Sequence, residues 1–403
     1  MVGPDHEASC MKAAEKKAIQ NYKRVAVIHD WLTGMRGGEV VLEAILELFP
    51  GAELFTLLHI PGSCSDFIEN RPIHTSFIQK FPWKARLYRH YLPFFPTAIE
   101  EFDFHGFDLV ISSSHCVAKS VIVPPDVPHI SFVHSPMRYV WDMYRQYFPG
   151  KGLLQKLVIP FFANYLRTWD AASAHRVDDY VSNSAFVGSR IRRFYGRSAT
   201  VVHPPCLDRA PASRDIPDPE GDQREDFYLV LSALVPYKRI DLAVQAFSES
   251  GKKLVIAGKG PEEKRLRSMA SGNIEFLGHV ERSGIQELYT KALGLIFPGV
   301  EDFGIVPVEA QAAGCPILAL GRGGALETVV DGKTGLFFSQ ESAASLNDAV
   351  KRREGIRFKK SDFARNTARF TRDAFQSGII SSIQRAQKTI AGSRSSSKPG
   401  RLR

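Results

Sequence analysis

The feature that most constrains the fold is an alternation that occurs twice along the chain. Short apolar runs rich in β-branched residues are separated by segments in which apolar residues follow helical spacing. In the first half these runs lie at 24–28, 109–111, 129–133, 179–181 and 200–202. In the second half they lie at 228–231, 254–257, 274–277, 293–297, 316–320 and 336–338. Strands that alternate with helices predict an α/β protein with two doubly wound parallel sheets.

A polar stretch from Asp208 to Asp226 separates the two halves, as is typical of a solvent-exposed connection. The predicted order is an N-terminal extension (1–22), a Rossmann-like acceptor domain (23–208), a linker (209–225), a Rossmann-like nucleotide-sugar domain (226–375), a helix packing back toward the first domain (376–387) and a basic disordered tail (388–403). Ligands of open α/β sheets bind at the carboxyl ends of the strands. We therefore expect the active site in a cleft between the two domains.

The amino-acid composition limits the class of protein and the cellular compartment. The 403 residues are 44% hydrophobic and 24% charged, which suits two globular cores. The five cysteines are an odd number, lie far apart and form no Cys-x-x-Cys pair, which argues against a disulfide framework or a zinc ribbon and favours a reducing compartment. Charges recur through the first residues, so we expect neither a signal peptide nor an anchor there. The prediction is a cytoplasmic protein, with peripheral contact at the inner face of the cytoplasmic membrane left open.

The net charge of +9 suits an anionic partner, such as a phosphorylated substrate, an acidic membrane surface or nucleic acid. Nucleic acid is not expected, because the basic tail supplies part of the charge. Between Lys80 and Phe95, basic and aromatic residues alternate. Two interpretations stay open for this segment: an interfacial membrane segment, or a core helix followed by a turn at Pro93 and Pro96, which we favour.

Two carboxylates follow the apolar run that ends at Phe297. Glu301 and Glu309 are eight residues apart, and Gly304-Ile305-Val306-Pro307 between them is expected to open a helix. The free amides of that first turn suit an anion. Charged acceptors form strong hydrogen bonds with hydroxyl groups, so the pair suits the sugar and ribose of an extended ligand.

Glu301 and Glu309 also stand in a series of ordered motifs: 232–239, 258–261, 276–280, Ala313-Gly314-Cys315-Pro316, Gly323-Gly324-Ala325-Leu326-Glu327 and 331–336. In these motifs the chain resembles the retaining GT-B glycosyltransferases of family 4. Its opening segment, 29–39, and the segment 235–239 resemble bacterial mannosyltransferases that build surface polysaccharides from GDP-mannose.

The resemblance implies a role for each matched residue in the second domain. Lys238 would neutralise the donor diphosphate, Glu301 would bind the sugar hydroxyls and Glu309 the ribose. The loop Phe303-Gly304-Ile305 would contact the donor, and the backbone around Val280 its base. A second cation of the family pattern is replaced by Ala233, and the neighbouring Arg239 is the candidate to supply it.

In the first domain, two motifs follow predicted strands. Gly37 and Gly38 precede Glu39 in a glycine-rich turn, and glycines let the backbone approach a ligand closely. His134 follows the run at 129–133, where the family carries a histidine close to the transferred sugar. Its expected role is to orient the sugar or acceptor and not to act as a nucleophile.

Metal and ATP chemistry are not indicated. The chain contains no Asp-x-Asp triplet, and Gly332-Lys333-Thr334 lacks the earlier glycine of a phosphate-binding loop. We predict no cofactor and no metal. The expected reaction transfers a hexosyl group, mannose from GDP-mannose, to an acceptor hydroxyl of a lipid-linked or polysaccharide precursor. The alternatives are a UDP-sugar donor and a sugar-nucleotide epimerase of the same architecture.

Overall fold

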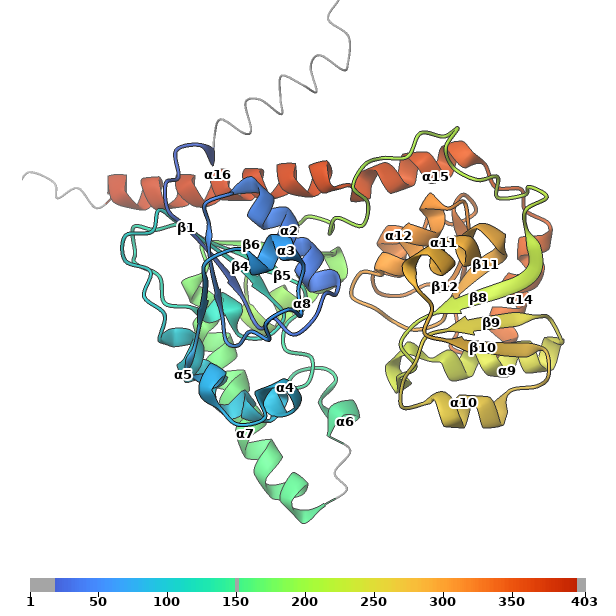
Figure 1. The fold of residues 1–403 in the computed structure, drawn as a ribbon, viewed down its shortest axis with the longest axis horizontal. Helices are drawn as coiled ribbons and strands as arrows, with labels where there is room; N and C mark the ends of the chain where they lie inside the picture. The colour runs from blue at the N-terminus through green and yellow to red at the C-terminus, as the bar shows by residue number, and fades with distance from the viewer. Residues whose placement is uncertain (1–18, 149–151, 397–403) are drawn as a thin grey trace, which may run out of the picture. The chain divides into compact units, whose positions relative to one another are not determined.

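A computed structural model of the chain describes residues 19–148 and 152–396. The chain divides into two compact units (Figure 1). Unit 1 comprises the chain up to Val202 and again from Ala374 onward, and unit 2 comprises His203–Asp373. The predicted extension up to residue 18 and the end of the predicted tail, after residue 396, lie outside the described residues.

Unit 1 contains a parallel sheet of seven strands within the described residues, in the order β3-β2-β1-β4-β5-β6-β7. Its strands are β1 (Val25–His29), β2 (Glu53–Thr56), β3 (Ile73–Thr75), β4 (Leu109–Ser114), β5 (His129–Val133), β6 (Asp179–Ser182) and β7 (Ala199–Val201). Side chains of a strand alternate between the two faces of a sheet. Val25 and Val27 accordingly enter one apolar core, while Ala26 and Ile28 enter another on the opposite face.

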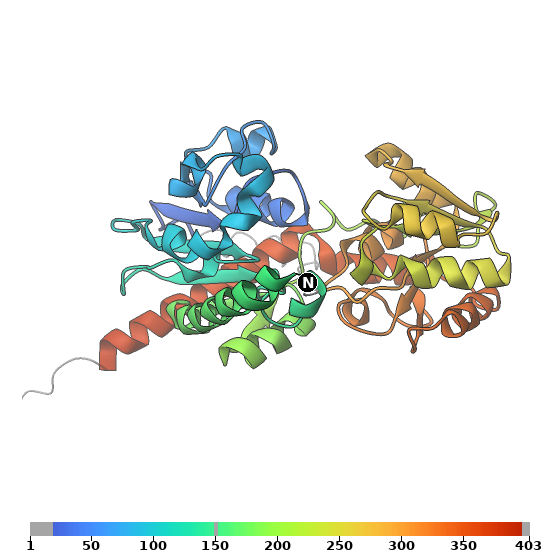
Figure 2. The same cartoon turned by 90° about the horizontal axis from the view of Figure 1, so that it is seen from below.

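Helices cover both faces of this sheet (Figure 2). They are α2 (Gly37–Leu48), α3 (Asp66–Glu69), α4 (Lys84–Leu87), α5 (Phe95–Glu100), α6 (Tyr144–Tyr147), α7 (Leu153–Ser173), α8 (Ala185–Tyr195) and α16 (Arg372–Ser396). Short 3-10 turns lie at Phe77–Lys80, Tyr88–Phe94, Ala118–Ser120 and Ala174–Arg176. The chain returns to unit 1 through α16, whose Phe375, Ile379 and Ile383 join the core around Val25.

Unit 2 repeats the plan with six strands in the order β10-β9-β8-β11-β12-β13. The strands are β8 (Glu225–Leu231), β9 (Leu254–Ala257), β10 (Ile274–Gly278), β11 (Ala292–Phe297), β12 (Ile317–Leu320) and β13 (Gly335–Phe338). The helices are α9 (Ile240–Ser250), α10 (Glu263–Met269), α11 (Arg282–Lys291), α12 (Ile305–Ala312), α13 (Ala325–Thr328), α14 (Ala343–Glu354) and α15 (Lys360–Thr367), with 3-10 turns at Pro236–Lys238 and Ala368–Phe370.

Both sheets place their candidate site at the same topological position. In unit 1 the strand order reverses between β1 and β4, and in unit 2 between β8 and β11. Connections from such a pair leave toward opposite faces, so a crevice opens beyond their carboxyl ends. The predicted α/β class, with two doubly wound parallel sheets, is confirmed.

The structure corrects several details of the sequence prediction. Strands β2 and β3 were not predicted, because β2 contains only two apolar residues and β3 only one. The predicted linker is not a free connection: Arg224 donates hydrogen bonds to the carbonyls of Tyr289, Ala292 and Gly314, which fixes this stretch to unit 2.

Two segments of unit 1 also differ from the sequence prediction. The helix expected over 376–387 is part of the longer α16, and residues 388–396 of the predicted tail continue that helix. Segment 80–95 does not form one core helix. It is broken into α4, a 3-10 turn and the start of α5, with Tyr88 and Phe95 buried and Trp83 exposed.

Candidate functional site

The two loops at the strand reversal of unit 2 carry opposite charges. Lys238 ends the loop after β8, and Glu301 lies in the loop after β11. The Nζ of Lys238 lies 2.5 Å from Oε1 of Glu301, and both side chains are largely buried. The pair therefore sets a cation suited to phosphate beside a carboxylate suited to hydroxyl groups.

Glycines allow these loops to approach each other. A Cβ at Gly299 would lie 2.8 Å from the carbonyl oxygen of Lys238, closer than real Cβ contacts. A Cβ at Gly324 would lie 2.3 Å from backbone atoms of Phe303, and the Gly324 amide donates to the carbonyl of Glu301 at 2.8 Å. Gly323 and Gly324 are thus explained by packing, because a side chain at either position would collide with the loop that carries Glu301.

The same loop leads into the amino end of α12. Gly304 has φ +99°, a left-handed conformation that favours glycine, and Ile305 begins the helix. Phe303 is buried against the rings of His203 and Phe370. The first amides of a helix have no acceptor within it, and the helix dipole favours an anion there. This end of α12 is therefore a natural contact for a phosphate group.

Glu309, further along α12, lies in a different environment from Glu301. The Oη of Tyr289 donates to its Oε2 at 3.4 Å. Burial raises the pKa of the Glu309 carboxyl, although the charge of Arg282 and the Tyr289 hydrogen bond act against that rise. A half-buried carboxylate with few donors around it gains from each hydroxyl that a ligand brings.

Two other residues of unit 2, Arg239 and Val280, were predicted to contact the donor. Arg239 has φ +53°, and its guanidinium forms ion pairs with Glu341 at 2.5 Å and Asp241 at 3.2 Å. A diphosphate would have to compete with both carboxylates for it. Val280 follows β10 and packs on the first turn of α11, where a Cβ at Gly284 would lie 2.8 Å from its Cγ1.

In unit 1, His134 belongs to a chain of polar side chains. Its Nε2 lies 2.9 Å from the Oγ of Ser113, which in turn lies 3.2 Å from Nδ1 of the buried His29. Nε2 of His29 lies 3.7 Å from Oε1 of Glu39. A Cβ at Gly38 would lie 3.5 Å from the His29 ring and 3.9 Å from the His134 ring. The structure therefore brings the predicted Gly38 and His134 together, with Gly37 beginning α2 beside them.

The buried Asp30 fixes the loop 115–118 next to these hydrogen-bonded side chains. The carboxylate of Asp30 accepts hydrogen bonds of 2.6 to 2.9 Å from four successive backbone amides, those of residues 115–118. Asp30 directly follows β1, and these amides follow β4. The bonds thus tie together the two loops at the strand reversal. They also hold His115 against Trp31, with the ring centroids 4.3 Å apart.

Burial favours the neutral form of two histidines in this cluster, His134 and His115. It lowers the pKa of His134 well below its usual value, and the nearby His115 and His29 lower it further. Burial also lowers the pKa of His115, although the charge of Asp30 opposes the change. At neutral pH these imidazoles each carry one donor and one acceptor nitrogen. They can orient a sugar or acceptor hydroxyl without placing a positive charge there.

The sequence analysis missed several residues that build the site: Ser113, Asp30, His115, Gly299, Arg282 and Tyr289. A signal existed for the first three. The run Ser112-Ser113-Ser114-His115 is polar, yet it closes a strand whose residues are buried. Polar groups at the carboxyl end of a buried parallel strand indicate a site. Arg282 and Tyr289 reach Glu309 from α11, and only the packing of α11 on α12 reveals them.

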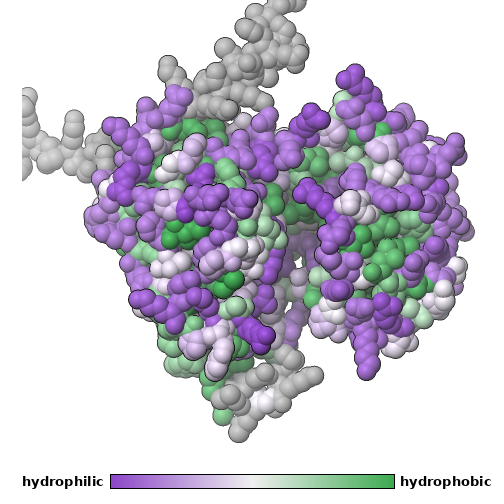
Figure 3. Space-filling model, viewed as in Figure 1, coloured by the Kyte–Doolittle hydropathy of each residue, from purple (hydrophilic) through white to green (hydrophobic). Residues whose placement is uncertain are grey.

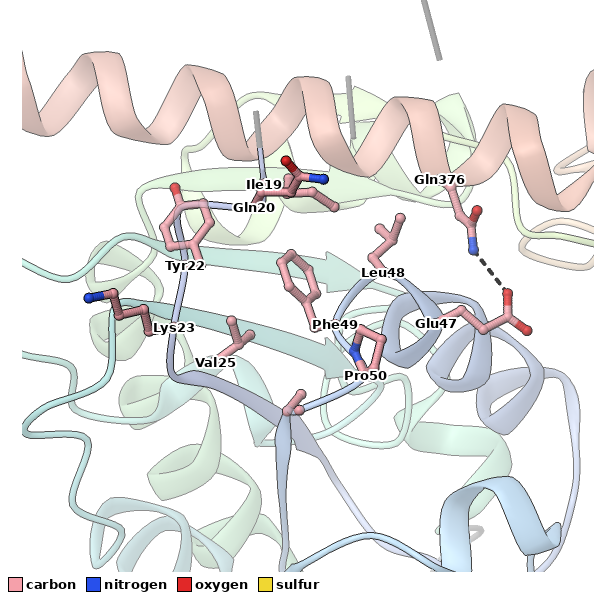
Figure 4. Close-up of a pocket in the computed structure, with 12 residues that line it drawn as sticks. Ile19, Gln20, Tyr22, Lys23, Val25, Glu47, Leu48, Phe49, Pro50 and Gln376 are labelled. Carbon is pink, nitrogen blue, oxygen red and sulfur yellow. Dashed lines mark hydrogen bonds between the residues drawn. The ribbon is translucent and has the colours of Figure 1, made fainter. Parts of the chain in front are cut away.

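One pocket lined by described residues lies away from these residues. It is a cavity of about 500 Å³ in unit 1, lined by Tyr22, Val25, Phe49 and Gln376 among others (Figure 4). Because Val25 is the first residue of β1, this cavity lies at the amino ends of the strands. A hydrogen bond from Gln376 to Glu47 closes one side. None of the predicted site residues lines it.

Two family models match the chain in succession. The model described as Glycosyltransferase Family 4 matches residues 35–210, and the model described as Glycosyl transferases group 1 matches residues 213–369. Together they cover the loops that carry Gly38, His134, Lys238, Glu301 and Glu309. The chain belongs to the family 4 glycosyltransferases of the GT-B class.

Curated relatives show modest similarity. The GDP-mannose-dependent alpha-(1-6)-phosphatidylinositol monomannoside mannosyltransferase of Mycolicibacterium smegmatis is 33% identical over 41% of this chain and 50% of its own length. The alpha-1,3/1,6-mannosyltransferase ALG2 of Kluyveromyces lactis is 28% identical over 58% of this chain and 53% of its own length. The chain thus spans about half the length of the curated relatives it matches.

Solved structures share the fold. The Anabaena protein Alr3699/HepE, solved with UDP, has a TM-score of 0.58 and 16% identity, covering 93% of this chain and all of that one. Sucrose-phosphate synthase from Thermosynechococcus elongatus has a TM-score of 0.57 and 15% identity, with coverage of 93% and 98%. Within the described residues, no helix combines the length and the apolar character needed to cross a membrane.

Proposed function

We propose that the chain is a retaining, metal-independent mannosyltransferase that moves mannose from GDP-mannose to a hydroxyl group of a lipid-linked or polysaccharide precursor. The observation that carries the proposal is the Lys238–Glu301 pair at the strand reversal of unit 2, next to the amino end of α12. This arrangement offers a cation, oriented amides and a carboxylate to a nucleotide-diphosphate sugar, and no protein-bound cofactor is required.

In the proposed reaction, the bond between the sugar and the diphosphate breaks and negative charge develops on the leaving phosphate. Lys238 and the amides of Ile305 and its neighbours stabilise that charge, the role that a metal ion plays in other transferases. Glu309 binds the ribose and Glu301 the sugar hydroxyls. His134, neutral and held by Ser113, orients the sugar or the incoming hydroxyl.

The carboxylates of unit 1 support a route without a covalent intermediate for the proposed retaining reaction. Asp30 is fully buried and occupied by four backbone amides, and Glu39 faces His29 and the amide of Arg36. Neither is set as a nucleophile at the edge of the site. We therefore propose that the acceptor hydroxyl attacks from the side of the leaving group, and that a diphosphate oxygen takes its proton.

The donor base rests on the GDP-mannose-dependent relatives, and a UDP-sugar is the second candidate because the Anabaena protein was solved with UDP. The test is to incubate the chain with GDP-mannose or UDP-glucose in the presence of a chelator, with and without a lipid-linked acceptor. We expect GDP to be released only when acceptor is present, and the product to keep the anomeric configuration of the donor. Release of UDP alone would replace GDP-mannose as the donor, and an inverted product would refute the attack geometry.

The proposed setting is a bacterial cytoplasm, with the enzyme at the inner face of the membrane that carries its acceptor. Nucleic acid is not proposed as a partner. Activity that persists in the chelator would support metal independence, and activity restored only by a divalent cation would refute it.

A further inference from the structure

Helix α7 of unit 1 is longer than the sheet it covers. It has 21 residues, which corresponds to about 31 Å, whereas β5 has five residues, or about 17 Å. The buried Ala163, Leu166 and Asp170 lie in the second half of α7. The first half therefore extends beyond the sheet, as Figure 1 shows.

The part of α7 that extends beyond the sheet exposes apolar side chains at helical spacing. Leu157 is 67% exposed and Phe161 is 72% exposed, and they lie on one face with the partly exposed Tyr165. Val158 and Phe162 widen this face. We call these five residues the α7 stripe. At this lower end of unit 1, apolar residues show at the surface in Figure 3.

A second exposed segment lies at the same end of unit 1. Residues 77–94 follow the carboxyl end of β3, and α6 and α7 follow the carboxyl end of β5. In a parallel sheet both connections leave the same edge, which is also the edge that carries His134. Tyr88 and Phe95 share one apolar core with Ala163 of α7. Trp83, 75% exposed, and Phe94, 51% exposed, lie outside that core.

Basic residues outnumber acidic ones in the segments that carry these side chains, although Glu100 and Glu101 follow the first of them. Residues 77–99, 143–148 and 157–169 contain six lysines and arginines and no aspartate or glutamate. Among the described residues, none of these six, Lys80, Lys84, Arg86, Arg89, Arg145 and Arg167, forms an ion pair. Exposed aromatic and aliphatic side chains among unpaired cations suit the boundary between lipid headgroups and acyl chains.

From this combination, we propose that the α7 stripe, with Trp83 and Phe94, is a docking surface for an anionic lipid membrane. A second copy of the chain is a poorer occupant, because a symmetric pair would bring the same cations together. The docking proposal rests on the exposed apolar side chains and the cations of this surface. Its purpose, to bring a lipid-linked acceptor to the edge of the sheet that carries His134, rests on the proposed function.

The experiment is sedimentation of the full chain with vesicles of phosphatidylcholine alone or mixed with phosphatidylglycerol. We expect strong binding only to the mixed vesicles, weakened by salt because screening shortens the range of the attraction. The variant Leu157→Ser/Phe161→Ser should lower the partition coefficient by roughly tenfold or more, since two apolar side chains no longer enter the lipid.

The matched control is Phe67→Ser/Met269→Ser, which removes two exposed apolar side chains outside the α7 stripe and should bind vesicles as the unaltered chain does. Thermal unfolding and GDP binding of both variants should match those of the unaltered chain. If the unaltered chain binds vesicles but not GDP, the proposed function fails and the docking proposal stands. Equal vesicle binding by the two double variants, no binding to mixed vesicles, or a dimer that only Leu157→Ser/Phe161→Ser dissociates would overturn the proposal.

Discussion

The two units build their sites from the same strand arrangement but from opposite kinds of chemistry. At the reversal of unit 1, His29, Ser113 and His134 are joined by hydrogen bonds, and burial lowers the pKa of His134. At the reversal of unit 2 lie opposite charges, Lys238 and Glu301, held in an ion pair. The common fold fixes where a ligand meets each sheet, and the side chains at that position decide which ligand it is. On the proposed function, the charged loops of unit 2 suit the diphosphate and the sugar hydroxyls, and the hydrogen-bonded side chains of unit 1 suit the acceptor hydroxyl.

The largest effect should come from removing the cation of unit 2. Lys238→Ala takes away stabilisation of the leaving phosphate and should lower kcat by about 10²–10³-fold. Lys253→Ala removes an exposed lysine that only approaches Glu275 at 3.8 Å, and it should leave the rate unchanged. Initial rates with GDP-mannose check both variants, and similar rates for the two would remove Lys238 from the mechanism.

Acid should destabilise unit 1 in particular, because that unit buries neutral histidines. Burial lowers the pKa of His129 from 6.5 to about 4. The unfolded chain therefore binds the proton first, and the stability this group maintains above pH 6.5 is lost as the pH falls toward 4, by about 3 kcal/mol. Urea unfolding followed by tryptophan fluorescence checks this, since all four tryptophans belong to unit 1.

The control for that experiment is unit 2, whose two histidines, His203 and His279, are partly or fully exposed. Hydrogen exchange of β11 in the same urea series should show little loss of stability over this pH range. If unit 2 weakened as much as unit 1, buried histidine would not be the cause of the acid sensitivity.

Ser113 should matter for the reaction more than for the fold. Ser113→Ala breaks the contacts to His134 and His29 and should lower kcat by roughly tenfold, the cost of about one hydrogen bond to an oriented group. Ser113→Thr keeps the hydroxyl and should restore part of the rate. If both variants changed only the melting temperature, the hydrogen bonds between Ser113, His134 and His29 would serve only the fold.

Glu309→Gln should have the smallest effect on stability, and of the opposite sign. Burial raises the pKa of Glu309, so its ionised form weakens the fold as the pH rises through that pKa. The neutral amide should raise the melting temperature of unit 2 by a few degrees at most, while GDP binding weakens because the ribose loses a charged acceptor. A lower melting temperature would show that the carboxylate supports the fold.

Much of the fold could be predicted from the sequence, because parallel strands buried on both faces appear as continuous apolar runs. Strands β5 and β9 begin and end where predicted. Strands β2 and β3 contain at most two apolar residues each, so they show no such run. The attachment of the polar stretch before β8 depends on Arg224 reaching three distant carbonyls. Local composition carries no information about such contacts.

The site was predictable in unequal parts for the same reason. Lys238, Glu301 and Glu309 stand in motifs whose spacing is local, so a role for each could be predicted from the sequence. Ser113 acts only because β4 and β5 pair side by side and bring it to His134. For Arg239, the sequence showed a cation beside Lys238 but could not show that Glu341, about a hundred residues later, pairs with it.

The central claim is that the nucleotide diphosphate binds at the strand reversal of unit 2, and hydrogen–deuterium exchange of the full chain with and without GDP tests it most directly. The account predicts slower exchange in the loops 232–239 and 298–305 and around Gly324, with no such change in Lys238→Ala. Protection confined to the loops 30–38 and 115–118 of unit 1, with none in unit 2, would contradict it.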